Sequence, residues 1–438
     1  MKITDVLPRS QILVKELAEG LNLGKCSFEQ VEKRILQFLY ELGRVLEEEI
    51  LQGVREPTIE NSLRVGERTA VYSGKRNRRF LNRFGAEVVL ARRCYKFRDG
   101  AGGWVPLDEK LGLNRCLGYS PLMSYLLSSF GSSEAFAQAA KLLGEALGFG
   151  VSATAVQRNT EAVGERIPDT PYAMISSQRG QKPCEVMVVE VDGTISPQIQ
   201  EQQGLRGRES LKQPTDWKEC NVVVVQKMQA GEEVDRWIGA RYGQHQEFDT
   251  YAGRAALAMG QHFARKLVFL ADGAHTNWEL QQTNFPASVG ILDFYHASEH
   301  LGVFCSLLAD QRKAKVTHAR WDHMLLDGQA LQVTQEMRRR ADTVADRDSA
   351  IREINYFKNN LSRMDYDTYR AQGFPIGSGL VEGSCKFVVG KRFKGSGMRW
   401  KRQDNIRVLR ARVEKLNGNL HRYFQPQPQK WISESAVA

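Results

Sequence analysis

The chain has 438 residues, a formal net charge of +10 and the composition of an ordinary globular protein. Its length exceeds that of a usual single domain, so we expect two or three packed units. No apolar run approaches the ~20 residues that span a bilayer, and the N-terminus "MKITDVLPRS" lacks the apolar stretch of a signal peptide. We therefore expect neither a membrane protein nor a secreted one, and predict a cytoplasmic location.

The seven cysteines are widely scattered and include no C-x-x-C pair. A disulfide framework or a compact cysteine metal site would need closer spacing. We expect these cysteines to be reduced and mostly buried.

Two segments account for the net positive charge of the chain. Residues 64–98 contain eleven Lys or Arg against two acidic residues, and residues 386–422 contain twelve against two, whereas the rest of the chain is net negative. A charge run is often only a solvated face of a helix or strand. Two such runs interleaved with aromatic residues favour a polyphosphate partner, and nucleic acid is the leading candidate.

The N-terminal region, residues 1–60, is predicted to be helical. Within it, residues 28–52 place apolar side chains at helical spacing from Val31 to Ile50, which indicates an amphipathic helix. The pattern then changes, because residues 61–117 alternate in short segments with glycine breaks. This second region carries the first basic segment and is predicted to be a small β unit.

Residues 118–170 return to a helical pattern and have the layout of a helix-turn-helix. A first helix from Ser133 would end near Gly148, and Ser152 or Thr154 would cap a second one. Two short helices around a glycine turn are also common in proteins that do not bind DNA. In the DNA-binding interpretation the second helix would expose three polar side chains, Gln157, Arg158 and Asn159.

A Pro- and Ser-containing segment at 168–183 is predicted to be a linker. Three strands with short connections and then strand-helix units follow, which indicates a mixed α/β sheet. The ribonuclease H-like fold has this order, and in it the first and fourth strands are adjacent and parallel. The ends of these two strands, at Asp192 and Asp272, would then lie side by side. The expected strands are 185–191, 220–228, 234–241, 266–271 and 289–293, with a helix at 249–264.

Residues 184–300 are thus predicted to form the first part of a ribonuclease H-like core. Residues 301–372 have helical patterning throughout. The stretch "FPIGSGLVEGSCKFVVGKRFK" interrupts that pattern with a proline and glycines, and restarts a helix near Glu382. We assign residues 373–424 to the completion of the core and residues 425–438 to a tail.

The stretch "EVMVVEVDGTIS" is a run of strand formers that leads to an acid, Asp192. Haloacid-dehalogenase phosphatases carry an acid in a similar "DGT" context. Their signature is Asp-x-Asp-Gly-Thr, however, and Glu190 stands where the nucleophilic aspartate would be. An acid after a central strand also suits a metal-dependent nuclease, which is the interpretation we prefer.

Phosphodiester chemistry on two hard cations needs oxygen ligands, because Mg²⁺ prefers an octahedral shell of oxygens. Asp192 is the candidate ligand that bridges the ions, and Asp272 and Glu382 are the candidates that complete the site. Any one of these acids alone would be read as a turn or helix cap. Their combination predicts a catalytic triad that holds Mg²⁺ or Mn²⁺, two ions per active site.

At these residues the chain resembles DDE transposases of the bacterial Mutator-like superfamily, most closely the ISKra-type insertion-sequence transposases. The resemblance extends over roughly residues 60–424 and implies a ribonuclease H-like catalytic domain with an all-helical insertion between the second Asp and the Glu. The motifs that carry it are "VEVDGT" with Asp192, "LADGAHTNW" with Asp272, "ILDFYHASEHL" with Asp293 and His296, and "PIGSGLVEGSCKFVVGKRFKGSGMRW" with Glu382.

Members of this family often carry paired cysteines in the β unit, whereas here only Cys94 and Cys116 lie near it. No zinc ribbon is therefore expected. The motif "DFYH" resembles the family's Asp-x-x-His element, which implies that Asp293 and His296 lie near the active site or the DNA. His296 would donate to a phosphate or a water, or would be a satisfied histidine at a helix start.

The stretch "HASEH" also matches the inverted zinc-protease signature, with His296 and His300 one helical turn apart. That interpretation leaves Asp192, Asp272, Glu382 and both basic segments unexplained. We therefore do not prefer it.

The basic segment after Glu382 is predicted to hold DNA against the metal site through phosphate contacts. Trp278 and Trp400 would either stack on an unpaired base or lie in the core. The residues predicted to contact DNA in this segment are Lys386, Lys391, Arg392, Lys394, Arg399, Trp400 and Lys401.

These features predict a DNA transposase that cuts at the ends of its element with metal-activated water and joins the freed 3′-hydroxyl to target DNA. Its N-terminal third would recognise the terminal inverted repeats, and a homodimer or larger assembly would join two ends at the nucleoid. Two other classes stay open. One is a ribonuclease H-like nuclease or resolvase that cuts without joining, and the other is a non-catalytic DNA-binding protein derived from a transposase.

Overall fold

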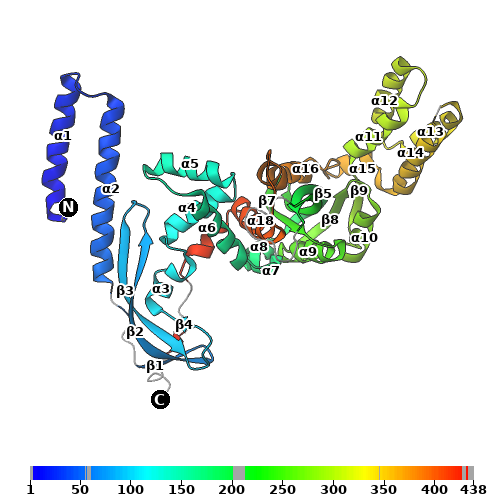
Figure 1. Ribbon diagram of the computed structural model, residues 1–438. Helices are drawn as coiled ribbons and strands as arrows, with labels where there is room; N and C mark the ends of the chain where they lie inside the picture. The colour runs from blue at the N-terminus through cyan, green and yellow to red at the C-terminus, as the bar shows by residue number, and fades with distance from the viewer. Residues whose placement is uncertain are drawn as a thin grey trace. The chain divides into compact units, whose positions relative to one another are not determined.

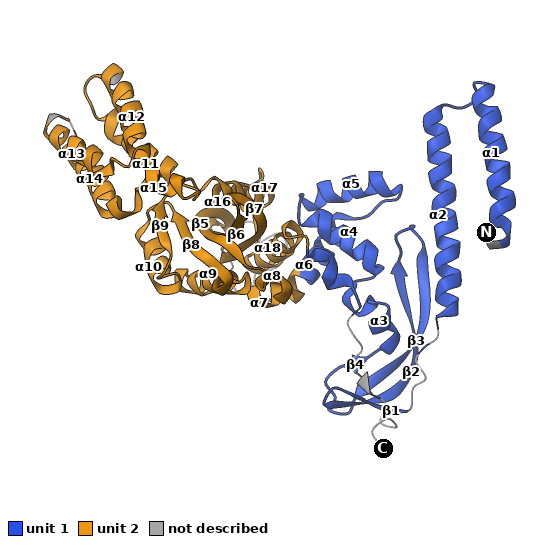
Figure 2. Ribbon diagram, turned by 180° about the vertical axis from the view of Figure 1, so that it is seen from behind, with its two compact units in different colours: residues 1–163, 419–438 blue, residues 164–418 orange. Residues whose placement is uncertain are grey.

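The computed structural model describes residues 3–54, 56, 61–200, 213–344, 346–426 and 431–432. It divides into two compact units (Figure 2). Unit 1 comprises residues 1–163 and 419–438, and unit 2 comprises residues 164–418. Within the described ranges, no helix is both long enough and apolar enough to cross a membrane.

The boundaries of these units differ from those expected. The division falls within helix α6 (Ala153–Arg166). The segment predicted to be a linker instead forms two short helices, α7 (Pro171–Met174) and α8 (Ser177–Gly180), because Met174 is buried in the interior of unit 2. The chain leaves unit 2 at Gly418, so the core of that unit ends before residue 424.

Unit 1 begins with two helices, α1 (Val6–Asn22) and α2 (Phe28–Gly53), after a 3-10 turn at Ile3–Asp5. Helix α2 confirms the helix predicted over 28–52. It starts in a capping box, in which the Ser27 hydroxyl accepts from the Gln30 amide and the Gln30 side chain accepts from the Ser27 amide. Residues 55 and 57–60 of the predicted helical region lie outside the described residues.

An antiparallel sheet follows, as predicted for the small β unit. Its strand order is β10-β1-β2-β3-β4, and its buried core includes Tyr95 and Trp104. Of the predicted tail, residues 431–432 join this sheet, whereas 427–430 and 433–438 lie outside the described residues. The strands are β1 (Ser62–Val65), β2 (Arg68–Leu81), β3 (Glu87–Phe97), β4 (Gly103–Trp104) and β10 (Trp431–Ile432).

The rest of unit 1 is helical. Helix α5 ends at Gly148, whose φ of 71° lies in the left-handed region that favours glycine. The Ser152 hydroxyl caps α6 by accepting from the Ala155 amide at 3.1 Å. The two helices predicted around this glycine turn are therefore present. Besides α6, this region holds α3 (Pro106–Lys110), α4 (Pro121–Gly131), α5 (Phe136–Leu147) and 3-10 turns at Leu113–Arg115 and Leu420–Phe424.

Unit 2 is built on a mixed five-stranded sheet with the order β7-β6-β5-β8-β9 (Figure 1). Strands β5, β6 and β7 pair antiparallel, whereas β8 pairs parallel with β5 and β9 pairs parallel with β8. The first and fourth strands of the series are therefore adjacent and parallel, as predicted. The strands are β5 (Cys184–Ile199), β6 (Thr215–Gln229), β7 (Glu232–Tyr242), β8 (Ala264–Ala271) and β9 (Val289–Leu292).

Strand β5 is longer than predicted. We expected it to end at residue 191, but its pairing with β6 continues to Ile199, while its pairing with β8 stops at Glu190. Asp192 therefore lies within a strand, at the point where one side of that strand loses its neighbour. Residues 201–212, between β5 and β6, lie outside the described residues.

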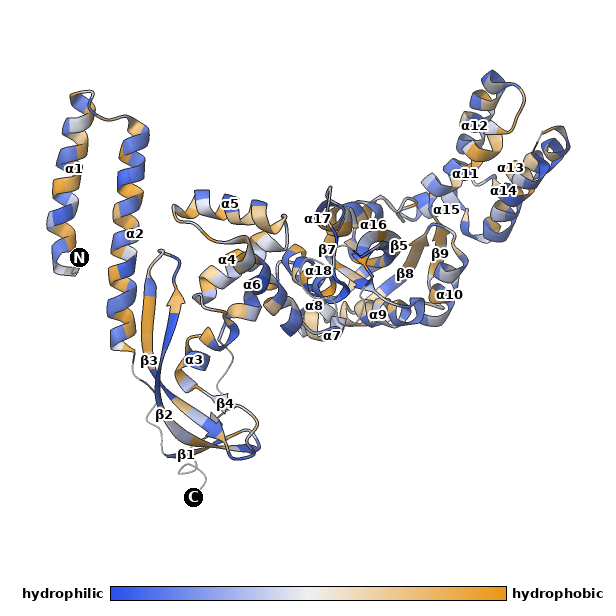
Figure 3. Ribbon diagram, viewed as in Figure 1, coloured by the Kyte–Doolittle hydropathy of each residue, from blue (hydrophilic) through white to orange (hydrophobic). Residues whose placement is uncertain are grey.

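The central strands form the core of unit 2. Residues 222–225 and 268–271 are buried throughout, which is typical of strands covered on both faces. Figure 3 shows β8 and β9 mostly in the hydrophobic colour. The helices next to the sheet are α9 (His245–Ala258), α10 (His275–Asn284) and α18 (Arg402–Leu416), with a 3-10 turn at Gln261–Phe263.

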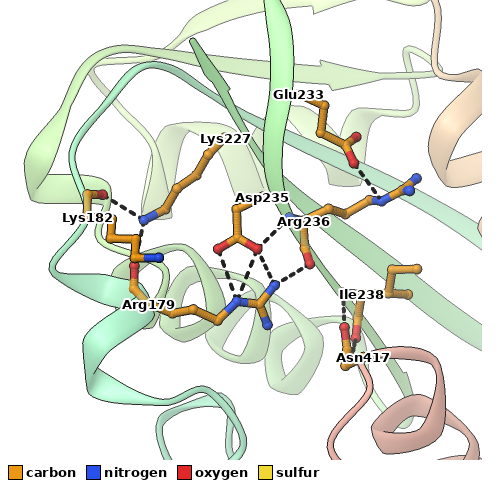
Figure 4. A network of polar contacts seen from close by, with 8 residues as sticks. All are labelled: Arg179, Lys182, Lys227, Glu233, Asp235, Arg236, Ile238 and Asn417. Atoms are coloured by element: carbon orange, nitrogen blue, oxygen red, sulfur yellow. Dashed lines mark hydrogen bonds and ion pairs between the residues drawn. The ribbon is translucent and has the colours of Figure 1, made fainter.

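Polar contacts hold the edge strand β7 (Figure 4). The Arg179 guanidinium of α8 donates to both carboxylate oxygens of Asp235, and the buried Lys227 ammonium donates to two backbone carbonyls in the turn after α8. Asn417 accepts from the amide of Ile238 at 3.0 Å and donates to its carbonyl at 2.8 Å. The Asn417 side chain therefore occupies backbone groups of Ile238 that an edge strand would otherwise offer to another strand.

Between β9 and residue 372 the chain is helical, as predicted. Trp321 is fully buried among these helices, and its indole N–H donates to Glu336 at 3.0 Å. The chain then continues through α16 (Gly379–Ser384), a π-helical turn (Cys385–Gly390) and α17 (Lys391–Phe393). The preceding helices are α11 (Phe294–Ser306), α12 (Gln311–Leu326), α13 (Ala330–Arg340), α14 (Arg347–Asn360) and α15 (Tyr366–Ala371), with 3-10 turns at Ala341–Thr343 and Leu361–Arg363.

Candidate active site

Three acids occupy the carboxyl edge of three neighbouring strands. Glu190 of β5 pairs with Leu270 of β8, and Ala271 of β8 pairs with Leu292 of β9. The same registers, continued, bring Asp192, Asp272 and Asp293 to one level across β5, β8 and β9. Asp192 and Asp272, predicted from 80 residues apart to lie side by side, interact electrostatically.

Asp192 is a partly buried carboxylate. Burial raises its pKa, and the negative charge of Asp272 raises it further. Two donors oppose this effect, the Gly193 amide at 2.7 Å and the thiol of Cys385. Burial is thus the largest effect that disfavours its charge, and the positive charge of His296 opposes that of Asp272. A cation bound beside Asp192 would favour its ionised form.

Asp272 follows β8 directly and is held by its own loop. One carboxylate oxygen, Oδ1, accepts from the Ala274 amide at 3.0 Å and from the Asn277 side chain at 2.8 Å. The Tyr356 hydroxyl of α14 donates to the backbone carbonyl of Asp272 at 2.8 Å. Gly273 makes this turn possible, because its φ is 91° and a Cβ there would meet Tyr356.

Glu382 lies on α16, and its side chain is about one third exposed with an ion pair to Lys386 at 3.6 Å. It borders a cavity of about 480 Å³ that also reaches Asp192. Helix α16 contacts β5, which explains how these two acids meet from distant parts of the chain. The cavity is lined by Asp192, Gly193, Thr194, His296, Glu299, Glu382, Cys385, Lys386, Gly390 and Lys394.

Asp293 and His296 form a bonded pair at the start of α11. Asp293 is the N-cap of the helix, and its Oδ1 accepts from the amide of His296 at 2.7 Å and lies 3.2 Å from the imidazole Nδ1. This contact raises the pKa of His296 to about 9, so the imidazole is cationic at neutral pH. Burial opposes ionisation of Asp293, but bonds from His296 and Ser378 hold its pKa below the usual value. His296 therefore lines the same cavity as Asp192 and Glu382, and Asp293 lies directly beside His296.

The potential metal ligands do not all converge as predicted. Among the described residues, a group of three ligand atoms within 4.8 Å of one another is formed by Asp293, His296 and Glu382. The predicted triad does not form such a group, because Asp192 turns to Cys385 and Asp272 to its own loop. Asp192 and Glu382 line one cavity, and Asp272 lies beside Asp192. The carboxylate oxygens of these three acids are the type of ligand that Mg²⁺ or Mn²⁺ prefers.

The helix-turn-helix prediction is only partly right about exposed side chains. On α6, Arg158 is exposed and Gln157 is half-buried with a hydrogen bond to Glu161 at 2.7 Å. Asn159 was expected to be exposed, but it is buried and donates to the Ala155 carbonyl of its own helix. A contact of Asn159 with DNA is therefore not supported.

The basic segment after Glu382 divides into two groups. Lys386 and Lys394 line the cavity, and Lys394 donates to the Thr194 hydroxyl at 2.6 Å. Arg392 and Trp400 are buried, with the guanidinium 4.7 Å from the indole centroid, so their predicted contacts with DNA are corrected to core packing. The other predicted contacts, which are not buried, stay predictions: Lys391, Arg399 and Lys401.

The first basic segment is less positive than its composition suggests. Asp108 is buried between Arg78 and Arg92, each at 2.8 Å, so these two guanidinium groups serve the interior of the β unit. Other arginines of the segment pair with acids at its surface. The exposed cations without an ion pair to another described residue are Arg64, Lys75, Arg76, Lys96 and Arg98.

Two alternatives weighed from the sequence are not supported. His300 turns to Glu353 at 2.6 Å and stacks on the ring of Tyr356, whereas His296 bonds to Asp293, so the two histidines do not form the pair of a zinc protease. Trp278 is buried against Phe269 and is core rather than a stacking platform.

Six of the seven cysteines are buried and none is in a disulfide, as expected.

The sequence interpretation missed two residues of the site. Cys385 donates to Asp192, and nothing in its sequence context distinguishes it from an ordinary buried cysteine. Glu190 is buried two residues before Asp192. Its position inside an apolar strand was a signal in the sequence, because a buried carboxylate needs a hydrogen-bond partner.

A scan against protein-family models finds no match, and a search of curated protein sequences finds no similar protein.

Proposed function

We propose that this chain is a DNA transposase of the DDE type, with a ribonuclease H-like catalytic domain in unit 2. The observation that carries the proposal is that Asp192 and Asp272 are neighbours at the edge of parallel strands β5 and β8, while Glu382 lines the same cavity as Asp192. The strand order supports the ribonuclease H-like assignment. The helices between β9 and α16 correspond to the all-helical insertion of that family.

The metal would be held by Asp192, Asp272 and Glu382, with Asp192 as the shared ligand. Bound Mg²⁺ or Mn²⁺ supplies activation of a water nucleophile and neutralises charge on the leaving oxygen. The donors Gly193 and Cys385 favour the ionised form of Asp192, although burial disfavours its charge and raises its pKa. No zinc is part of this proposal.

The cations of the cavity would bind the scissile strand. Lys386, Lys394 and protonated His296 all face the cavity, so a phosphate there meets three positive groups. Such contacts bind DNA without reading its sequence and weaken as salt rises. In unit 1, the exposed cations of the β unit and Arg158 of α6 are the groups that would contact the terminal inverted repeats.

Transposition joins two ends in one complex, so we propose that the protein acts as a dimer or larger assembly at the bacterial nucleoid. An apolar stripe on α2 supports self-association, because its members lie at spacings of four and seven residues and are exposed in the single chain. The stripe consists of Phe28, Ile35, Leu39, Leu46 and Ile50.

The test is cleavage and joining of a labelled duplex that carries the element's own ends, with Mg²⁺ or Mn²⁺. Wild type is compared with Asp192→Asn, and with Asp348→Asn as a control at an exposed acid on α14. We expect metal-dependent cleavage and joined products in wild type and in the control, and neither in Asp192→Asn.

Other outcomes separate the alternatives. Cleavage without joined products would favour a nuclease or resolvase. Binding without cleavage under either metal would favour a non-catalytic descendant of a transposase. Equal cleavage by Asp192→Asn and wild type would refute the active-site assignment.

A further inference from the structure

Two buried carboxylates of unit 2 do not line the cavity. Glu190 of β5 is 2% exposed and Asp293 is 0% exposed. A carboxylate without water must find hydrogen-bond donors, since burying an unpaired charge is costly. The donors therefore indicate what each of these side chains does.

Each carboxylate accepts from one backbone amide at the start of α16. The amide of Ser378 donates to Asp293 Oδ2, and the amide of Val381 donates to Glu190 Oε2 at 2.9 Å. A third tie lies next to them, where the amide of Phe294 donates to the carbonyl of Ile376 at 2.8 Å. Three contacts thus hold six consecutive residues against β5 and α11.

This arrangement satisfies amides that have no partner within their own helix. The first amides of a helix lack an i−4 carbonyl, and here two of them at α16 are taken by acids from other elements. The Glu382 amide then donates to the Ser378 carbonyl at 3.0 Å, which starts the helix. Asp293 and Glu190 therefore contact the first turn of the helix that carries Glu382.

We propose that Glu190 and Asp293 are positioning residues that place Glu382 at the cavity. Asp293 belongs by distance to the group of possible metal ligands with His296 and Glu382. Its oxygens, however, already accept from Ser378 and His296, so the role assigned to it is to hold α16 and not to bind the ion. The catalytic consequence of this inference rests on the proposed function, whereas the structural part does not.

The contacts of Glu190 and Asp293 with the start of α16 together form a clamp. The loop before α16 packs closely, as such a clamp requires. A Cβ added at Gly377 would stand 2.6 Å from the ring of Tyr295, and 3.9 Å from the carboxylate of Asp293. Gly377→Ala should therefore displace the loop or the exposed ring of Tyr295 that packs against it. A Cβ at Gly379, two residues further on, meets no atom within 4 Å, so Gly379→Ala is a matched control.

The first measurement is hydrogen–deuterium exchange on peptides that cover residues 376–385, which needs no enzyme activity. Glu190→Leu keeps roughly the same side-chain volume but removes the acceptor, so the buried Val381 amide loses its hydrogen bond. We expect this variant and Gly377→Ala to exchange about 10-fold faster in this segment, with β8 unchanged. Glu190→Gln, which keeps an acceptor oxygen, and Gly379→Ala should resemble wild type.

The second measurement is the metal requirement of DNA cleavage. Loss of a group that orients a ligand typically costs about 10–100-fold in metal affinity or activity. We expect Glu190→Leu to need about 10-fold more Mg²⁺ for half-maximal cleavage than wild type, with DNA affinity unchanged and Glu190→Gln close to wild type.

The two measurements separate the two proposals. Unchanged exchange in Glu190→Leu and Gly377→Ala would overturn the proposal that these acids hold α16. Faster exchange with an unchanged metal requirement would overturn the proposal that they place Glu382 at the metal site. If wild type cleaves no DNA, the proposed function fails, and the exchange experiment still decides whether these acids hold α16.

Discussion

The close approach of helices α6 and α18 is a sharp test of packing in unit 2. A Cβ added at Gly164 of α6 would stand 1.9 Å from the carbonyl oxygen of Arg407 in α18. Since a Cβ keeps at least 3.0 Å from other atoms, Gly164→Ala requires the two backbones to separate by about 1 Å. The neighbouring atom belongs to the backbone and cannot rotate away, so the cost falls on the whole contact.

We expect Gly164→Ala to lower the free energy of unfolding by about 2 kcal/mol. Overpacking typically costs about 1–3 kcal/mol or more, and the better helix propensity of alanine returns about 1 kcal/mol. For a unit of this size the melting temperature should fall by roughly 4–8 °C. Thermal unfolding followed by circular dichroism measures this difference.

Gly144→Ala in α5 is the matched control. A Cβ there has its nearest neighbours at 3.7 and 3.9 Å, which is ordinary contact. The same substitution should therefore stabilise the protein by about 0.5–1 kcal/mol through helix propensity alone. A Gly164→Ala variant as stable as wild type would refute the described approach of the two helices.

Three further predictions concern the site and the β unit. Cys385→Ala removes the thiol that donates to Asp192, so half-maximal cleavage should need about 10-fold more metal. Cys385→Ser keeps a donor and should stay near wild type. If both variants need the same metal concentration, the thiol does not support metal binding through Asp192. In metal-free protein, the pKa of His296 is raised from 6.5 to about 9, so its stabilising effect is complete below pH 6.5 and lost as the pH rises through 9. Urea unfolding across that window should show on the order of 2 kcal/mol of pH-dependent stability that His296→Gln lacks, and parallel profiles would contradict the assignment. Asp108→Asn leaves Arg78 and Arg92 without their buried carboxylate and should lower the free energy of unfolding by about 3 kcal/mol. Asp99→Asn, at the exposed pair with Arg68, should have little effect, and equal urea midpoints for the two variants would contradict this prediction.

Local pattern was enough to predict the strand series of unit 2 and the helices after it. Continuous apolar runs identified β5, β6 and β8, because strands covered on both faces cannot hold polar side chains. Acids placed directly after such runs, at Asp192 and Asp272, were visible in the same way. The adjacency of these two acids followed from strand order, which the structure bears out.

The sequence pattern predicted the exposure of charged side chains less well than it predicted helices and strands. A count of Lys and Arg cannot distinguish an exposed cation from one that a distant acid neutralises. Arg78 and Arg92 look like a DNA-binding surface in the sequence, yet Asp108 holds both in the interior. Arg392, six residues after Lys386 in the same basic run, is buried against Trp400.

The sequence by itself determined which elements form and which side chains have the chemistry of a metal site, because both depend on residues near one another in the chain. Only the tertiary structure decided what each of those side chains contacts. His300 turns to Glu353, Asn159 turns into its own helix, and Asp293 holds the start of α16. Each of these outcomes depends on which donor or acceptor another element brings within about 3 Å, and the spacing of residues along one element carries no information about that distance.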